Sequence, residues 1–213
     1  MRNIVIYGDS NTWGFEPAVG RRYPHDQRWG GVLRDALGSA YWVNEEGLNG
    51  RTTVHPDPVD GEYKNGYATL EAILHTHKPI DLLVFLLGTN DLKARFTVSP
   101  QEIAMSMGRL VKLAKRTETG LDGRSPRILL MAPAKLAPLE GTIYETIFGS
   151  QAQAKSYELG KYYREQAQLL DVDFIDVSEH VVSSTVDGIH WELSEHSKLG
   201  FVVAKSIQTI FGG

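Results

Sequence analysis

The sequence contains no cysteine among its 213 residues, and this absence excludes several kinds of chemistry. Without thiols the chain forms no disulfides, uses no cysteine nucleophile, and binds no zinc or iron-sulfur group through cysteine. It also lacks a long apolar run, since the short run after Arg2 reaches neither a signal-peptide core nor a membrane-spanning length. We therefore expect a cytoplasmic protein that does not contact membranes.

Excess positive charge is also missing. The 22 Lys and Arg residues are outnumbered by 26 Asp and Glu residues, which gives a net charge of -4 without a dense basic cluster. Nucleic-acid phosphates need a basic surface, so small or neutral partners are expected instead. Glycine-rich nucleotide-binding strings are absent, and the scattered histidines have no companions at metal-ligand spacing. The sequence therefore predicts no cofactor and no metal.

The chain does contain an alternation of short apolar runs and longer helical patterns. Its length and 42% hydrophobic content predict one well-buried domain over residues 1–213. The predicted strands are 3–7, 41–44, 81–88, 127–132 and 173–177, and the predicted helices are 29–38, 66–77, 100–117, 151–170 and 195–211. Because the third and fourth strands are apolar on both faces, we expect a parallel sheet covered by helices on both sides, in a doubly wound α/β fold.

Two strings far apart in the chain carry candidate catalytic residues. The first strand ends in Gly8-Asp9-Ser10, and the loops that follow the strands of such sheets are where ligands bind. In Asp187-Gly188-Ile189-His190, the spacing lets the carboxylate accept a hydrogen bond from one ring nitrogen and leaves the other nitrogen to take a serine proton. Each string alone also fits an ordinary turn. Together they predict an activated serine nucleophile.

Two further strings follow the second and third strands. Asn90 lies in Gly88-Thr89-Asn90-Asp91, where its side-chain amide can donate a hydrogen bond to an oxyanion. Gly50 lies where the lack of a side chain lets the backbone approach a bound group. These strings also fit a plain turn and a flexible loop. The long Gly- and Pro-rich connections 14–31, 49–66 and 133–149 are expected to shape the pocket and any subunit contacts.

Taken in order, Gly8-Asp9-Ser10, Gly50, Gly88-Thr89-Asn90-Asp91 and Asp187-Gly188-Ile189-His190 resemble the sequence blocks of the SGNH hydrolases, also called the GDSL family of esterases and lipases. The resemblance implies that Ser10 is the nucleophile, His190 the base and acid, and Asp187 its orienting partner. It also implies an oxyanion hole formed by the Ser10 and Gly50 backbone N–H groups and the Asn90 side chain. The implied fold is a flavodoxin-like three-layer α/β/α sandwich with a five-stranded parallel sheet.

The longer strings at 8–14, 45–53 and 87–94 resemble the arylesterase and acyltransferase (perhydrolase) branch of that family. Members of this branch hydrolyse short-chain and aryl esters, transfer acyl groups to alcohols or hydrogen peroxide, and form oligomers. The resemblance therefore implies a small-molecule ester substrate and a homo-oligomer. Asn11 stands where the commoner family wording has Leu, and this departure leaves the catalytic residues unchanged.

The aromatic residues Trp13, Phe15 and Trp191 are candidates for the walls of an acyl or aryl pocket, although aromatic residues near turns also pack cores. Two alternative functions stay open. One is a carbohydrate O-deacetylase, which would share the catalytic residues and differ in the shape of its pocket. The other is a non-catalytic flavodoxin-like module that holds a phosphate or a flavin in its strand-end loops.

Overall fold

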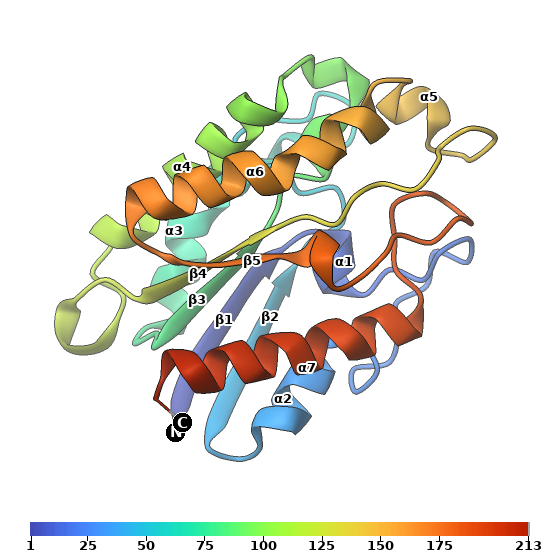
Figure 1. Cartoon of the computed structure of the whole chain (residues 1–213). Coiled ribbons are helices and arrows are strands. Elements are labelled where there is room, and N and C mark those ends of the chain that lie inside the picture. Colours follow the sequence, from blue (N-terminus) through green and yellow to red (C-terminus); the bar gives the residue numbers. More distant parts are fainter. Residues whose placement is uncertain (213) are drawn as a thin grey trace.

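The computed structural model describes residues 1–212, which form a five-stranded sheet flanked by helices (Figure 1). The strands are β1 (Arg2–Gly8), β2 (Tyr41–Gly47), β3 (Leu82–Leu86), β4 (Arg127–Ala132) and β5 (Asp173–Asp176). They lie in the order β2-β1-β3-β4-β5, and each neighbouring pair is parallel. Every predicted strand is present, although β2 continues to Gly47, beyond its predicted end at 44.

Helices cover both faces of the sheet (Figure 1). On one face lie α2 (Trp29–Leu37) and α7 (Leu193–Ile210), and on the other lie α3 (Gly66–His77), α4 (Pro100–Arg116) and α6 (Ala152–Leu170). The connections hold the short helices α1 (Ser10–Trp13) and α5 (Glu145–Phe148) and short 3-10 turns at 62–64, 90–92, 94–96, 121–123 and 177–179. The predicted three-layer α/β/α sandwich is confirmed, with the strand order of flavodoxin-like folds.

Alternating side chains on the strands build a separate core on each face of the sheet. In β1, Val5 and Tyr7 belong to the core under α3, α4 and α6, whereas Ile4 and Ile6 belong to the core under α2 and α7. All residues of β3 are buried, which explains why this stretch has no polar position. Each fully buried large apolar side chain contributes about 1.5–3 kcal/mol relative to exposure. The sheet is therefore stabilised by buried side chains on both faces, and its strand ends fix where the loops begin.

The strand register brings three of these loops to one place. Gly8 at the end of β1 pairs with Gly47 of β2 and with Leu86 of β3. The loops after these strands therefore leave the carboxyl edge of the sheet side by side, where ligands bind in open parallel sheets. Among residues 1–212, no helix combines the length and the apolar content needed to cross a membrane.

Candidate active site

Ser10 begins α1 directly after β1. The Oδ1 atom of Asp9 accepts a hydrogen bond from the backbone N–H of Asn11 at 3.0 Å and caps this short helix. The helix packs so closely on the strand end that a Cβ atom on Gly8 would lie 2.0 Å from Oγ1 of Thr12, so the position requires glycine. This sharp strand-to-helix turn places Ser10 at the carboxyl edge of the sheet.

His190 lies between Ser10 and Asp187. Its Nε2 atom is 2.9 Å from Oγ of Ser10, and its Nδ1 atom is 2.6 Å from Oδ2 of Asp187. Because an ionised carboxylate only accepts hydrogen bonds, Nδ1 carries the proton, which leaves Nε2 free to accept the serine O–H. The structure thus brings together the three residues that the two distant strings singled out.

The loop before α7 holds Asp187 in its orientation. Its Oδ1 atom accepts hydrogen bonds from the backbone N–H groups of Ile189 and His190, each at 2.9 Å. Burial raises the pKa of Asp187, but hydrogen bonds from the His190 ring and from these backbone groups outweigh it, so the pKa lies below its ordinary value. The carboxylate therefore stays ionised at neutral pH and can stabilise a protonated His190.

Two aromatic side chains pack against the His190 ring. Phe15 stacks on it with 4.1 Å between the ring centroids, and Tyr144 meets it edge-on at 5.7 Å. These contacts leave His190 only 4% exposed. Held by Phe15, Tyr144 and Asp187, the imidazole keeps one orientation toward Ser10, as a general base must.

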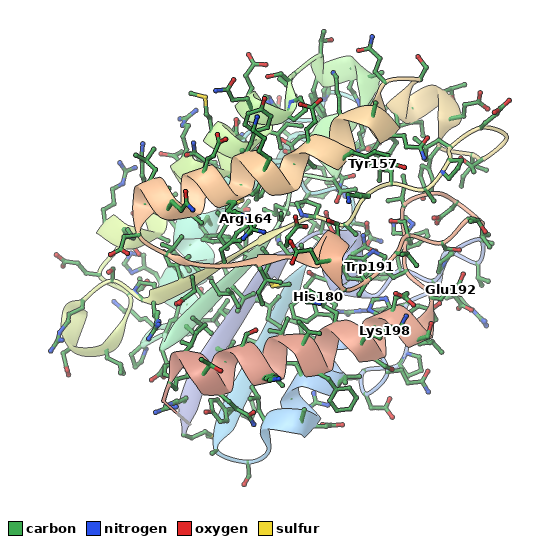
Figure 2. The ribbon with its side chains drawn as sticks, in the orientation of Figure 1. Tyr157, Arg164, His180, Trp191, Glu192 and Lys198 are labelled. Carbon is green, nitrogen blue, oxygen red and sulfur yellow. The ribbon has the colours of Figure 1, made fainter. Side chains whose placement is uncertain are left out.

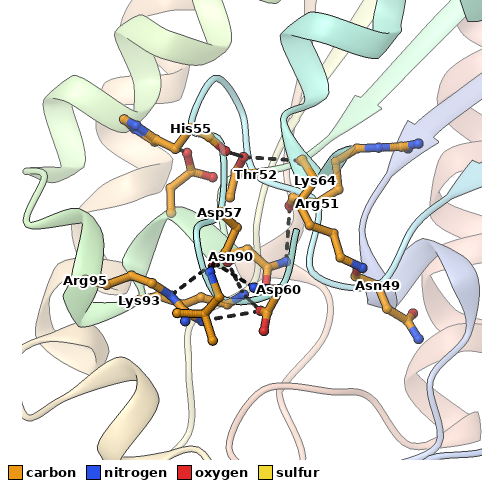
Figure 3. Close-up of polar contacts among 12 residues, drawn as sticks. Asn49, Arg51, Thr52, His55, Asp57, Asp60, Lys64, Asn90, Lys93 and Arg95 are labelled. Carbon is orange, nitrogen blue, oxygen red and sulfur yellow. Dashed lines mark hydrogen bonds and ion pairs between the residues drawn. The ribbon is translucent and has the colours of Figure 1, made fainter. Parts of the chain in front are cut away.

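Gly50 and Asn90 line the same cavity as Ser10. Gly50 has φ = 78°, in the left-handed region that favours glycine. The Nδ2 atom of Asn90 donates a hydrogen bond to the carbonyl oxygen of Arg51 at 3.2 Å, which ties the amide to the Gly50 loop (Figure 3). Two of the three predicted oxyanion donors, Gly50 and Asn90, therefore come from strand-end loops that contact each other beside Ser10.

Two buried carboxyl groups lie behind these loops. Asp91 accepts hydrogen bonds from the backbone N–H and the hydroxyl group of Thr53. Burial raises the pKa of Asp91 to about 7 and that of Asp9 to about 6. Asp9 bonds to the backbone N–H of Asn11 in α1 and Asp91 to that of Thr53 in the Gly50 loop, so the two carboxyl groups fix these segments, and neither lines the cavity.

A cavity of about 370 Å³ opens at Ser10. It is lined by Ser10, Phe15, Asn49, Gly50, Asp60, Lys64, Asn90, Lys93, Tyr144, Ile147, Phe148, Ile189 and His190. Most of its apolar wall comes from the 133–149 connection and most of its charged wall from the 49–66 connection. The prediction that the long connections shape a pocket is confirmed.

Of the three predicted pocket aromatics, Phe15 lines the cavity and the two tryptophans do not. Trp191 is 1% exposed and packs into the core under α7, so its assignment to the pocket was wrong (Figure 2). Although it follows His190 directly, its side chain joins the core while the histidine faces the cavity. Trp13 packs behind Phe15, with 6.3 Å between the rings, and the guanidinium of Arg22 lies 5.1 Å from its ring centroid.

A charged cluster at the cavity was not predicted from the sequence. The Nζ atom of Lys93 lies 3.1 Å from a carboxylate oxygen of Asp57 and 2.6 Å from one of Asp60, and Arg95 pairs with the same two carboxylates (Figure 3). The only sequence signal for it was the unusual length of the 49–66 connection. No three acidic or histidine side chains in the described part of the chain are placed to share a metal ion.

Comparison with known proteins identifies the family. The sequence model of the GDSL-like lipase/acylhydrolase family matches residues 6–194. The chain belongs to this family. The solved structure of a carbohydrate acetylesterase from Sinorhizobium meliloti is similar, with 36% identity and a TM-score of 0.93 over 99% of this chain and 100% of that one. The native aryl esterase of M. smegmatis is 35% identical, with a TM-score of 0.93 over 98% of this chain and 99% of that one.

A more distant relative is an acetylxylan esterase from Xylanibacter ruminicola, which is 24% identical over 217 residues. The alignment covers 96% of this chain but only 43% of that protein, so the chain spans less than half the relative's length. Membership of the GDSL-like lipase/acylhydrolase family places the chain among the carboxylic ester hydrolases and confirms the resemblance seen in the sequence. The names of these relatives include both aryl and carbohydrate esterases.

Proposed function

We propose that this member of the GDSL-like lipase/acylhydrolase family is a serine esterase that hydrolyses short-chain or aryl carboxylic esters through an acyl-enzyme. The observation that carries the proposal is the series of contacts from Asp187 through His190 to Ser10, with separations of 2.6 and 2.9 Å. These contacts favour an esterase over a non-catalytic flavodoxin-like module, because simple binding does not need a histidine placed to take a serine proton.

In the first step, Oγ of Ser10 forms a bond to the ester carbonyl carbon, and its proton passes to Nε2 of His190. The carbonyl oxygen gains negative charge, which the backbone N–H groups of Ser10 and Gly50 and the Asn90 amide stabilise. When the tetrahedral intermediate collapses, the bond to the alcohol oxygen breaks and that oxygen takes the proton from His190. The histidine then activates a water molecule, which attacks the acyl-enzyme, releases the acid and restores Ser10.

The cavity supports a small ester as substrate. Its volume of about 370 Å³ lies at the lower end of the range for small-molecule sites. Phe15, Tyr144 and Phe148 offer apolar contacts to a short acyl chain or an aryl ring. A long acyl chain would have to extend beyond this cavity into solvent.

Hydrolysis of p-nitrophenyl acetate and butyrate by the wild type, Ser10→Ala and His190→Ala tests the proposal. We expect the wild type to hydrolyse both esters and each variant to lose at least about a thousandfold in kcat. A phosphonate ester should add one adduct to the wild type, detected by intact mass, and none to Ser10→Ala. Turnover or an adduct that persists in Ser10→Ala would refute the assignment of the nucleophile.

A carbohydrate O-deacetylase is the second candidate. Asp60, Lys64 and Lys93 line the cavity. Lys93 pairs with Asp60, and Lys64 donates to the Asn49 carbonyl oxygen, but each ammonium group has three donors and so keeps capacity to bind a hydroxyl-rich alcohol. Two relatives with carbohydrate esterase names also favour it. An acetylated xylo-oligosaccharide should then have a higher kcat/KM than p-nitrophenyl acetate, and Lys64→Met should lower only the value for the oligosaccharide. An equal loss of kcat/KM on both substrates would contradict the idea that these charged side chains recognise a carbohydrate.

Other expectations stay predictions: acyl transfer to alcohols or hydrogen peroxide, a homo-oligomeric assembly, a cytoplasmic location, and one domain over residues 1–213, of which 213 lies outside the described residues. The ratio of methyl ester to free acid formed in methanol-containing buffer measures transfer. Light scattering of the purified chain measures the assembly, and limited proteolysis tests whether the chain resists cleavage as one unit.

A further inference from the structure

Arg51 is a buried cation that directly follows Gly50. The residue is 4% exposed, and its guanidinium carbon lies 4.0 Å from the centroid of the Tyr7 ring. Burial lowers its pKa, but an arginine in a protein stays protonated at any working pH. Within residues 1–212 it forms no ion pair with a carboxylate, unlike the similarly buried Arg28, which pairs with Glu45. Buried charges are normally paired, so this exception requires an explanation.

The guanidinium holds the ends of two strands. Its Nη1 atom donates hydrogen bonds to the carbonyl oxygen of Gly8, at 2.8 Å, and to the carbonyl oxygen of Glu46 in β2. Gly8 is the last residue of β1 and precedes the turn that carries Ser10. The side chain of Arg51 therefore fixes the strand end from which the candidate nucleophile is presented.

The backbone of Arg51 belongs to the proposed oxyanion hole. Its amide follows Gly50, and its carbonyl oxygen accepts the hydrogen bond from Nδ2 of Asn90 at 3.2 Å (Figure 3). On the far side of Arg51, the backbone N–H of Thr53 bonds to the buried carboxyl group of Asp91. One residue thus links the segments that carry all three proposed oxyanion donors.

Oxyanion stabilisation depends on donors fixed before the charge develops, and a displacement of about 1 Å can cost on the order of a hundredfold in rate. We infer that Arg51 is a positioning residue of the oxyanion hole: its guanidinium fixes the strand end that precedes Ser10, and its carbonyl oxygen holds the Asn90 amide. This inference rests on the serine esterase proposed above.

Steady-state kinetics of Arg51→Met and Arg51→Lys on p-nitrophenyl acetate test the inference. Methionine keeps the packing on Tyr7 without charge or donors, so kcat should fall about tenfold to a hundredfold while KM stays within about twofold. Lysine keeps the charge but has a single nitrogen, so it should recover part of the loss. Binding of phenylboronic acid, which forms an anionic tetrahedral adduct with an active serine, should weaken in parallel with kcat. Val203→Ala, in the core under α7, serves as a destabilised control with unchanged kcat.

A double-mutant comparison separates positioning from general loosening. If Arg51 acts through the Asn90 amide, the fold loss of kcat in the double variant Arg51→Lys/Asn90→Ala should be smaller than the product of the fold losses in the two single variants. An Arg51→Met variant with kcat near that of the wild type, or a loss confined to KM, would overturn the inference and leave the esterase proposal intact. If Arg51→Met does not fold, Arg51→Gln, which removes the charge and the guanidinium but keeps a polar side chain, decides in the same way. A wild type without turnover would overturn both.

Discussion

Replacing Asp187 by asparagine tests the catalytic geometry most directly. The amide oxygen of the new side chain can keep the bonds from the backbone N–H groups of Ile189 and His190, since both converge on Oδ1. The amide NH₂ group then takes the place of Oδ2 and faces Nδ1 of His190, where it donates instead of accepting. Nδ1 must therefore accept, the proton moves to Nε2, and the ring can no longer take the proton of Ser10.

The size of the effect follows from two contributions. A hydrogen bond to a charged group is worth about 1.5–3 kcal/mol, which is about tenfold to 150-fold in rate at 1.36 kcal/mol per tenfold. The wrong tautomer adds to this loss, and the same change in another Ser-His-Asp enzyme lowers kcat about 10⁴-fold. We expect Asp187→Asn to lower kcat on p-nitrophenyl acetate about 10³- to 10⁴-fold. KM should change little, because Asp187 is not among the residues that line the cavity.

Asp187→Ala is the comparison variant, and unlike asparagine it also leaves the backbone N–H groups of Ile189 and His190 without their acceptor. It removes the same charge but places no donor against Nδ1, so His190 can still adopt the productive tautomer in part of the molecules. The alanine variant should therefore be more active than the asparagine variant, with both chains folded as judged by thermal unfolding. An asparagine variant as active as the alanine variant, or within about tenfold of the wild type, would refute the tautomer argument.

Three further changes test the surroundings of the site. In ester hydrolysis, Asn90→Ala should lower kcat about 100- to 1000-fold and leave KM nearly constant. An unchanged kcat would show that the Asn90 amide is not an oxyanion donor. The pKa of Asp91 is raised to about 7, so the folded chain keeps a proton that an unfolded aspartate loses above pH about 4. Urea unfolding at several pH values measures the free energy of unfolding of the wild type and of Asp91→Asn. The value for the wild type, relative to that of the variant, should fall by at most about 4 kcal/mol as the pH rises from about 4 to about 7. Parallel pH profiles of the two proteins would contradict this. Gly88 has φ = 125°, and a Cβ atom there would lie 2.2 Å from the hydroxyl oxygen of Tyr163. Gly88→Ala should cost about 2–4 kcal/mol, seen as a lower urea midpoint, and an unchanged midpoint would show that the turn relaxes freely.

The main strands and helices could be predicted because their signals are local. β3 and β4 are apolar over their whole buried lengths, and the long helices show helical periodicity. The end of β2 could not be placed, because Asn44, Glu45 and Glu46 break the apolar run although they still pair with β1. Strand pairing at a sheet edge does not need apolar side chains, so hydrophobicity alone ends the strand too early.

The candidate catalytic residues could be predicted because each lies in a short string at a strand end or before a helix. Ser10, Asn90 and the Asp187–His190 turn need particular residue types at fixed spacings, and such requirements are visible in a sequence. Pocket walls carry no comparable signature. Phe15 and Trp191 are both aromatic residues near candidate catalytic residues in the sequence, yet one stacks on His190 and the other packs under α7. Only the direction of each side chain, set by the folded backbone, separates the two.

Arg51 shows why the electrostatics of the site lies beyond local sequence reasoning. In the sequence it is a basic residue in a glycine-rich loop, a position where charge is ordinarily solvated. Its burial follows from the sheet order, because β2 lies beside β1 and brings the loop after β2 against Tyr7 and the carbonyl oxygen of Gly8. The same order holds the loop of Asn90 beside it, since β3 lies on the other side of β1. The candidate catalytic groups are thus specified by local strings, whereas the contacts that surround them are specified by which strands are neighbours.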